Sequence, residues 1–403
     1  MNILISWHRR RSLLIAELLL LSALLPVTGL QAQSHRNPVD SVINTFMAER
    51  QIPGFAACVV KGKSVVWSNY YGTANREKNI PMGPEGIINI GSISKTFVAA
   101  AAMQLWEKGL LDLDADINQY LDFKIRNPKY PDKPITVFQL LTHTSSTRDG
   151  EAYYASYSCG DPVISLHDWI QGSLSPGGKF YNNGDSFGDW TPGAGEQKYS
   201  NIGFGLLGLI VERIAGEPFN EYCKKHIFVP LGMQNTGWLL GEVNTANHII
   251  PYAIITAENE GKILERKGLF APGTELAKNT LLPYCLYSFP NYPDGLVRTT
   301  LRDLSLYLIA MMNGGKINGN RILKKTTVHK MLSLQLKGSD SQGLAWHRDT
   351  LSGQRVWGHK GGDPGIAANL FFNTSGRTGV ITIQNILTGD TFPIVEKIYQ
   401  LIR

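Results

Sequence analysis

The sequence predicts an α+β fold, with one sheet assembled from both ends of the chain and a helical lobe inserted between them. Runs rich in β-branched and aromatic residues occur near the start of the chain and return toward its end. Between them, apolar residues recur mainly at helical spacing. A chain of 403 residues, 43 % apolar and 18 % charged, suits one large domain or two fused lobes with a well-buried core.

The first part of the chain alternates between helix and strand patterns. Apolar residues repeat at helical spacing over 40–50, and this pattern closes before Pro53. Two β-rich runs follow and are joined at 61–63, which indicates a hairpin. A long alanine-rich helix comes next and stops at Gly109.

The later elements are set by the same signals. One apolar helix ends at Gly216 and another at Asn313, and four β-rich runs precede a final helix. The expected helices are 40–50, 94–108, 136–141, 203–215, 301–312 and 393–402, and the expected strands are 55–60, 64–71, 343–347, 354–358, 367–372 and 378–384.

These elements divide the chain into a leader and one domain with two lobes. We expect the domain to cover 33–403, with a sheet lobe at about 33–91 and 290–403 and a helical lobe at about 92–289. Residues 145–195 are rich in Gly, Ser, Asn, Pro and aromatics and show weak periodicity. Long irregular stretches of this kind often form the walls of a functional site.

The N-terminal residues 1–32 have the layout of a secretory signal peptide. The basic run His8-Arg9-Arg10-Arg11 precedes an apolar stretch of about 14 residues, which is short of the roughly 20 that a spanning helix needs. We therefore expect a periplasmic or secreted protein. Glu17 within the apolar stretch leaves an uncleaved anchor open, and membrane association is expected only in that case.

The remaining composition excludes several classes of function. The net charge of +6 is modest, and no cluster of Lys and Arg interleaved with aromatics supports nucleic-acid binding. The four cysteines have no metal-binding spacing, so neither a metal nor another cofactor is expected. Export permits a disulfide, and Cys159 and Cys285 lie in loop-rich stretches where one could form, but the sequence does not decide whether one does. Cys58 and Cys223 fit buried thiols.

The strongest chemical signal begins at Ser92-x-x-Lys95, at the start of the alanine-rich helix. One helical turn places the two side chains on the same face. A lysine can take the proton of a serine hydroxyl if desolvation and neighbouring charge keep it neutral. The helix N-terminus also favours negative charge at Ser92. Alone, the pattern is weak, because a helix-capping serine with a surface lysine matches it equally well.

A second element is Tyr199-x-Asn201, just before an apolar helix. A tyrosine beside a lysine can, as a phenolate, relay protons between the nucleophile and the leaving group. The asparagine can hold Lys95 and a substrate amide by hydrogen bonds. Tyr181-x-Asn183 has the same pattern, but it lies in the irregular stretch with no helix behind it, and we interpret it as a loop aromatic.

A third element is His359-Lys360-Gly361-Gly362, which is flanked by strand patterns. A basic residue on a strand followed by glycines can line one wall of a cleft. The glycines allow close approach of substrate backbone, and the Gly362 amide can serve as an oxyanion donor.

The three elements, in this order, resemble the motif set of the class C β-lactamases, their D,D-peptidase relatives and the family VIII esterases. The resemblance covers roughly residues 40–400. It implies a β-lactamase/transpeptidase-like fold, with an antiparallel sheet flanked by helices and a cleft against the helical lobe. It also implies Ser92 as the acylated nucleophile, Lys95 and Tyr199 as the acid/base pair and Asn201 as the substrate-positioning residue.

The resemblance further implies roles for the third element, and here the sequence departs from the family. The Ser92 and Gly362 amides would form the oxyanion hole, and His359 stands where the family usually has lysine or histidine. The middle residue is commonly Thr or Ser, whose hydroxyl helps hold a substrate carboxylate, whereas this chain has Lys360. An outward Lys360 would favour neutral esters over β-lactams and D,D-peptides.

The predicted function is an exported serine hydrolase that cleaves an ester or amide through an acyl-enzyme. A peptidase for D-amino-acid or cell-wall peptides and a carboxylesterase are the leading forms. The alternatives are a β-lactamase and a non-catalytic penicillin-binding or sensor module, although the latter would typically lack Ser92 or Lys95. The expected partner is a small ester, amide or peptide substrate, and the chain is expected to be a monomer. We interpret His143, His167, His226 and His347 as structural or surface residues.

Overall fold

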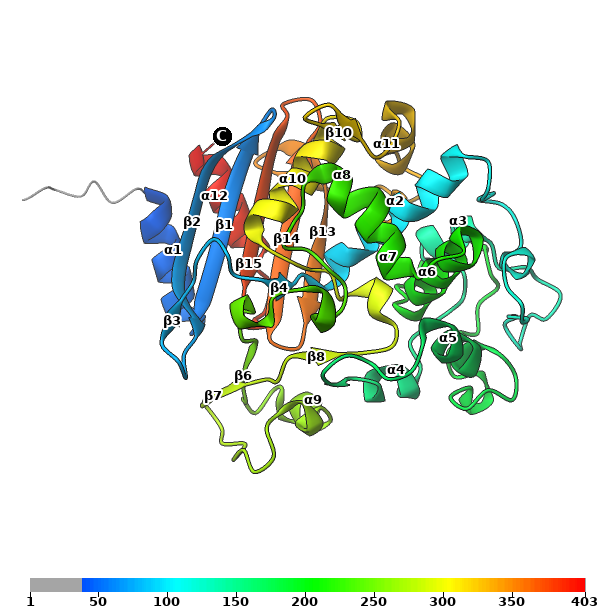
Figure 1. Ribbon diagram of the computed structural model, residues 1–403, viewed down its shortest axis with the longest axis horizontal. Coiled ribbons are helices and arrows are strands. Elements are labelled where there is room, and N and C mark those ends of the chain that lie inside the picture. Colours follow the sequence, from blue (N-terminus) through cyan, green and yellow to red (C-terminus); the bar gives the residue numbers. More distant parts are fainter. Residues whose placement is uncertain (1–37, 403) are drawn as a thin grey trace, which may run out of the picture. The chain divides into compact units, whose positions relative to one another are not determined.

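The computed structural model describes residues 38–402, which contain one large sheet of seven antiparallel strands (Figure 1). Its order is β12-β13-β14-β15-β1-β2-β3, so strands from the start and the end of the chain pair at β1 and β15. The predicted α+β architecture is confirmed in this respect. The strands are β1 (Gly54–Lys61), β2 (Ser64–Asn75), β3 (Ile80–Pro81), β12 (His347–Leu351), β13 (Gln354–Asp363), β14 (Ile366–Asn373) and β15 (Thr378–Gln384).

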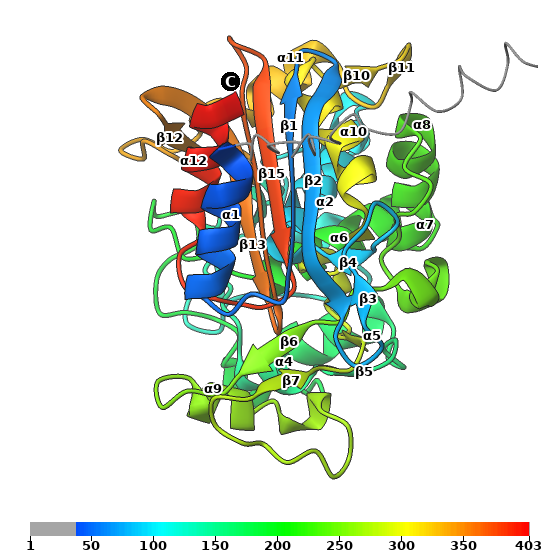
Figure 2. The ribbon, with the colours of Figure 1, turned by 90° about the vertical axis from the view of Figure 1, so that its left-hand side faces the viewer.

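Two terminal helices cover one face of this sheet, as Figure 2 shows. They are α1 (Pro38–Glu49) and α12 (Phe392–Ile402). Ile43 and Val395 lie in one buried cluster with Val59 of β1 and Val380 of β15. The two central strands are therefore buried on this face, which explains their nearly continuous apolar sequence.

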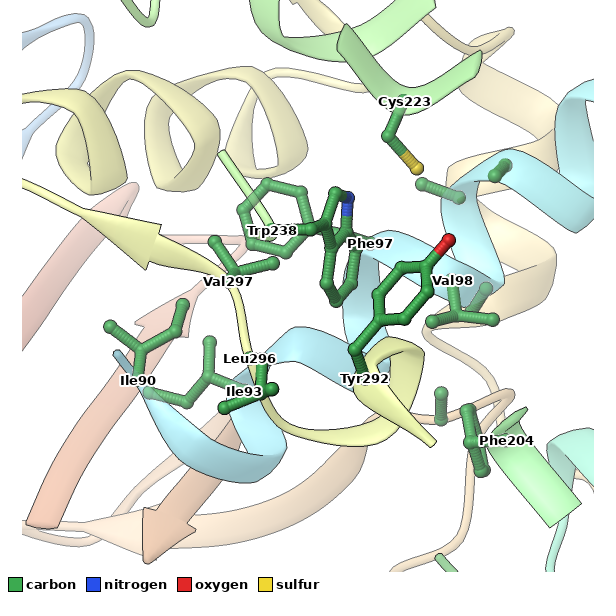
Figure 3. Packing of buried hydrophobic residues seen from close by; sticks show 14 of the residues in the cluster. Ile90, Ile93, Phe97, Val98, Phe204, Cys223, Trp238, Tyr292, Leu296 and Val297 are labelled. Atoms are coloured by element: carbon green, nitrogen blue, oxygen red, sulfur yellow. The ribbon is translucent and has the colours of Figure 1, made fainter. Parts of the chain in front are cut away.

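The opposite face is covered by α2 (Ser94–Glu107) and α10 (Leu301–Met312). Phe97 of α2 stacks on Tyr307 of α10 with ring centroids 3.8 Å apart. Figure 3 shows the packing around Phe97, where Trp238 and Val297 join the same buried cluster. The alanines of α2 leave room for neighbours on all sides, so a helix with little amphipathic pattern is almost entirely buried.

The remaining elements lie in the middle of the chain and around α10. Short strands pair as β4·β9, β5·β8, β6·β7 and β10·β11. The helices are α3 (Val137–Leu141), α4 (Glu151–Ala155), α5 (Leu166–Leu174), α6 (Ile202–Ala215), α7 (Phe219–Cys223), α8 (Val229–Leu231), α9 (Glu260–Leu264) and α11 (Lys325–Met331), and the strands are β4 (Ile88–Asn89), β5 (Ser158–Cys159), β6 (Tyr252–Ile254), β7 (Leu281–Pro283), β8 (Tyr287–Ser288), β9 (Arg298–Thr299), β10 (Lys316–Ile317) and β11 (Asn320–Arg321).

The strand expected at 343–347 is wrong. Ala345 has a left-handed backbone conformation with φ of 61°, which a strand cannot contain. Its amide donates to the Leu141 carbonyl, and the amide of Leu344 donates to the Met331 carbonyl. The segment is apolar because it is buried against helical neighbours, and the strand begins only at His347.

The structure also answers the question of a disulfide, which the sequence left open. Cys159 and Cys285 are bonded, with their Cα atoms 5.7 Å apart. The pairing of β5 with β8 brings these loop-rich segments together across 126 residues of sequence, which no local pattern indicates. Cys58 and Cys223 are buried free thiols, as expected.

The predicted signal peptide, residues 1–32, lies outside the described residues. Within residues 38–402, no helix combines the length and the apolar character needed to cross a membrane.

Candidate active site

Ser92 lies in a short 3₁₀ turn, Gly91–Ile93, which leads directly into α2. Gly91 has φ of 52°, and a Cβ at this position would come within 2.7 Å of the Gly362 amide nitrogen. Only glycine allows this backbone conformation and this close approach at little cost. The turn therefore holds the nucleophile candidate at the head of a helix and against the end of β13.

Lys95 reaches back from the first turn of α2 to Ser92. Its ammonium donates to Ser92 Oγ at 3.0 Å, to Asn201 Oδ1 at 2.7 Å and to the Asp294 carbonyl at 2.8 Å. The side chain is fully buried. All three ammonium protons therefore have acceptors, which leaves this lysine in a single fixed geometry.

The charge of Lys95 follows from its neighbours. Burial disfavours the ammonium, but the fields of Tyr199 and Asp294 outweigh it, and the pKa of Lys95 is raised. The raised pKa favours the charged ammonium over the neutral amine that a general base requires. In this geometry Lys95 supplies a positive charge beside Ser92 and stabilises negative charge that develops on Oγ.

Asn201 is oriented by a residue that the sequence analysis missed, Asp149. The two Asp149 oxygens accept from the Asn201 backbone amide at 2.8 Å, from the Ile202 amide at 2.9 Å and from Asn201 Nδ2 at 2.7 Å. With its NH₂ group held by Asp149, the Asn201 amide must present its oxygen to Lys95. Burial, the largest cause, raises the pKa of Asp149.

Tyr199 lies over the same lysine and is held from behind by His143. Lys95 Nζ is 4.9 Å from the Tyr199 ring centroid, and the His143 ring stacks on Tyr199 at 4.4 Å. His143 Nδ1 accepts from the Ser200 amide, and its carbonyl accepts from the Lys198 amide. His143 is thus a buried residue that fixes the segment containing Tyr199, which agrees with its interpretation as a structural residue.

The third element occupies the last part of β13, and its residues point in different directions. His359 is buried, with its ring centroid 6.5 Å from that of Tyr199. Gly361 passes so close to Ile90 that a Cβ would lie 2.0 Å from the Ile90 carbonyl oxygen. Gly362 lines the same cavity as Ser92.

Lys360 does not reach this cavity. Its ammonium lies 3.5 Å from Asp390 Oδ1 and 4.5 Å from the centroid of the Phe392 ring, and about half of its side chain is exposed. The side chain therefore points toward the N-terminus of α12, away from Ser92. Lys360 thus has the outward orientation that the sequence analysis considered. The third element, His359-Lys360-Gly361-Gly362, therefore offers the cavity no side-chain hydroxyl.

Tyr181 and Asn183, the second match to the tyrosine pattern, do not line the cavity at Ser92. Asn182–Gly184 forms a separate short turn. In residues 38–402, no group of three or more His, Cys, Asp and Glu side chains is arranged to hold a metal.

A cavity of about 250 Å³ opens beside Ser92, and several of its walls were not identified from the sequence. The irregular stretch supplies Tyr153, Tyr154 and Tyr157, which agrees with its expected role as a wall. Other walls are formed by Asp294, Arg266 and Phe289. The sequence around these residues has no pattern that predicts a functional role, so they are identified only by their position in the cavity wall.

The fold and the site together define a serine hydrolase. The Beta-lactamase family model matches residues 39–401, and the chain belongs to this family. Relatives in sequence include proteins named as a putative penicillin-binding protein, an esterase and a β-lactamase.

Individual relatives agree with this membership. The chain is 26 % identical to the putative penicillin-binding protein PbpX of Bacillus subtilis over 362 residues, covering 89 % of this chain and 78 % of that protein. The octameric penicillin-binding protein homologue of Pyrococcus abyssi superposes with a TM-score of 0.70 at 25 % identity, covering 90 % of this chain and 76 % of the other. D-amino acid amidase of Ochrobactrum anthropi SV3 has the same fold, with a TM-score of 0.66 at 21 % identity and coverage of 90 % and 96 %.

The extent of the match differs among relatives. The chain spans about half the length of several other curated relatives, among them proteins named as an esterase and a β-lactamase.

Proposed function

We propose that the chain hydrolyses an ester or amide through an acyl-enzyme on Ser92. Tyr199, as a phenolate, takes the Ser92 hydroxyl proton while Oγ attacks the carbonyl carbon, and then returns this proton to the leaving group. Water next attacks the acyl carbon and gives a proton to Tyr199, which passes it to Ser92 Oγ as the acid leaves and so becomes a phenolate again. Lys95 remains an ammonium and stabilises the charge that passes between Ser92 and Tyr199.

The developing oxyanion is bound by backbone amides. We assign this role to Ser92, at the head of α2, and to Gly362, which approaches the Gly91 turn. A helix N-terminus favours negative charge, and fixed amides need no reorganisation during the reaction. Asn201, locked by Asp149, positions Lys95 and the substrate amide.

The contacts of the Lys95 ammonium support this proposal most directly. A single buried ammonium contacts Ser92 Oγ at 3.0 Å and Asn201 Oδ1 at 2.7 Å while lying 4.9 Å from the centroid of the Tyr199 ring. Three separate sequence elements therefore meet at one charge. A helix-capping serine with a surface lysine would not bury the lysine or link it to the other elements.

For the substrate, we propose either a D-amino-acid or cell-wall peptide or amide, or a short neutral carboxylic ester. The outward Lys360 favours the neutral ester, since it leaves the third element without the hydroxyl that would help hold a carboxylate. The same feature argues against efficient β-lactam turnover. The presence of both Ser92 and Lys95 in hydrogen-bonding contact argues against a non-catalytic sensor.

The test is the Ser92→Ala variant, assayed on p-nitrophenyl esters, nitrocefin and D-amino-acid anilides. We expect kcat on the cleaved substrate to fall by on the order of 10⁴ or more, judged from other serine enzymes, with the melting temperature retained. Full activity in the alanine variant would refute the assignment. Preference for nitrocefin over short neutral esters in the wild type would refute the substrate proposal.

We also propose that the protein is exported and monomeric. The Cys159–Cys285 disulfide supports export, because disulfides persist in oxidising compartments. Sedimentation of the purified protein tests the monomer against an assembly such as the octamer named for the Pyrococcus abyssi homologue.

A further inference from the structure

The cavity beside Ser92 is lined by three charged side chains, two of them carboxyls. Asp294 ends the short turn Tyr292–Asp294 and its carbonyl accepts from Lys95, Asp363 ends β13, and Arg266 follows α9. Asp294 is 1 % exposed and Asp363 is 7 % exposed. Buried carboxyls are rare unless a cation or several hydrogen-bond donors compensate for their lost hydration, so the partners of Asp294 and Asp363 determine whether they carry charge.

Neutral groups supply nearly all of the hydrogen bonds to the two carboxyls. Asp294 Oδ2 accepts from the Tyr153 hydroxyl at 2.6 Å, and Oδ1 accepts no hydrogen bond. Asp363 accepts from the Tyr157 hydroxyl at 3.0 Å and, at 3.3 Å, from Asn89 Nδ2. Within residues 38–402, neither carboxyl forms an ion pair within 4.0 Å.

The nearby cations are engaged elsewhere. Lys95 uses its three protons on Ser92, Asn201 and the Asp294 backbone carbonyl, and so contributes its field to the Asp294 carboxyl but no hydrogen bond. Arg266 lies over the face of Tyr157, 5.1 Å from the ring centroid. Lys95 acts on Asp294 only through its field, and Arg266 acts on Asp363 through its own. Neither carboxyl is paired directly with a cation, so both can accept hydrogen bonds from a ligand ammonium.

The floor of the cavity is aromatic and also suits a cation. Tyr157 packs on Phe289 at 4.4 Å between centroids and lies 6.1 Å from Tyr153. Faces of such rings attract cations, as the contact with Arg266 already illustrates. A small cavity that combines aromatic faces with two under-compensated carboxyls selects a compact organic cation such as a primary ammonium.

We propose that this cavity is an ammonium subsite: Asp294 and Asp363 bind a primary amine on the acyl portion of the substrate. The enzyme would then act on amides or esters of unblocked amino acids and amino-terminal residues in preference to their N-acylated forms. Ser92 Oγ and the Asp294 carbonyl share the Lys95 ammonium, which places the subsite directly beside the nucleophile. The inference rests on the proposed acyl-enzyme function and specifies its substrate.

The subsite predicts a characteristic pH dependence. Burial is the main cause that raises the pKa of Asp363 to about 7 and that of Asp294 to about 6. Arg266 lowers the Asp363 value, whereas Asp294 raises it. Tyr157, Tyr287 and Asn89 also face Asp363.

Since only ionised carboxyls attract the ammonium, preference for the amine substrate should fall as the pH drops through about 7 to 6. It should fall again above about 8, where an α-amino group loses its proton.

The experiment compares alanine p-nitroanilide, in D and L forms, with the N-acetyl and N-succinyl derivatives at pH 7.5. We expect kcat/KM for the preferred enantiomer to favour the free amine over the N-acetyl form by about tenfold or more. Asp363→Asn and Asp294→Asn should each lower this ratio by a similar factor, whereas Asp340→Asn, an exposed carboxyl, should not change it. A ratio near one, or preference for N-acetyl or N-succinyl substrates, would overturn the subsite.

Labelling of Ser92 by a fluorophosphonate separates the two proposals. If Ser92 is not labelled, the acyl-enzyme function fails. If it is labelled, protection by alaninamide but not by N-acetylalaninamide supports the subsite even when no anilide is cleaved, and equal protection refutes it. If an asparagine variant does not fold, the wild-type pH profile of the protection decides.

Discussion

Asp149 shows how one partly buried carboxyl can set the orientation of three other groups. Its oxygens accept hydrogen bonds from two backbone amides at the start of α6 and from the NH₂ group of Asn201. This arrangement turns the Asn201 oxygen toward Lys95. Without this acceptor, the amide could turn over and place its NH₂ group against the ammonium. The position of Lys95 relative to Ser92 therefore depends on a residue outside the three recognised elements.

Asp149→Asn should lower kcat on a short neutral ester by about 10- to 100-fold, because small displacements of reacting groups carry costs of this size. KM should change much less, since Asp149 does not line the cavity. Steady-state kinetics with p-nitrophenyl acetate measures both quantities, and Asp132→Asn, an exposed carboxyl, is the control. An unchanged kcat would show that Asn201 keeps its orientation unaided.

At the scale of elements, strands and long helices follow from sequence pattern, whereas the walls of the site do not. The apolar runs of β1, β14 and β15 and the spacing in α6 and α10 predict their positions closely. The false strand at 343–347 arises because burial against helices also produces an apolar run. The walls of the site depend on contacts between residues far apart in the sequence. The Glu151 amide, for example, donates a hydrogen bond to the Asp185 carboxylate. Such pairs produce no periodic pattern in the local sequence.

The direction of Lys360 on β13 leads to a prediction for that strand. Lys360→Thr removes half-exposed contacts with Asp390 and with the Phe392 ring, each worth at most about 1 kcal/mol, so the melting temperature should shift by no more than about 4 °C. Activity on neutral esters should stay within about twofold, since the side chain faces away from the cavity. Calorimetry and ester kinetics measure the two effects. A loss of tenfold or more would place Lys360 in contact with substrate.

The Cys159–Cys285 bridge joins β5 to the segment before β8 and so ties together two walls of the cavity. The double variant Cys159→Ser/Cys285→Ser should lose about 2–5 kcal/mol of unfolding free energy, since the bridge closes a long loop. Denaturant unfolding measures this loss. Cys223→Ala, at a buried free thiol, is the control for sulfur removal alone.

Thiol counting provides a second check of the same bridge. The native protein should react with no thiol reagent, because Cys58 and Cys223 are buried and burial raises the pKa of both. After denaturation without reductant, two thiols should react. Four reactive thiols would contradict the bridge.

At the scale of the whole molecule, the two ends of the chain complete one sheet, and the site lies where that sheet meets the helices between them. Ser92, Tyr199 and Gly362 lie far apart in sequence but line one cavity. The order of the three elements and the family resemblance predicted that these residues lie close together in the fold. The supporting carboxyls could not be predicted, because Asp149, Asp294 and Asp363 acquire their roles only when the chain is folded.

The leader predicted at 1–32 gives a prediction for the whole chain. Protein secreted by a bacterial host should begin near Gln33, because the basic and apolar blocks before it resemble a signal peptide. N-terminal sequencing measures this directly. An intact Met1 on membrane-bound material would indicate an uncleaved anchor.

If Ser92 becomes acylated, peptide mapping after reaction with a fluorophosphonate should reveal it. We expect one adduct per chain, located on the peptide that contains Ser92, and no adduct in Ser92→Ala. An adduct at another serine or at Tyr199, or equal labelling of the alanine variant, would contradict it.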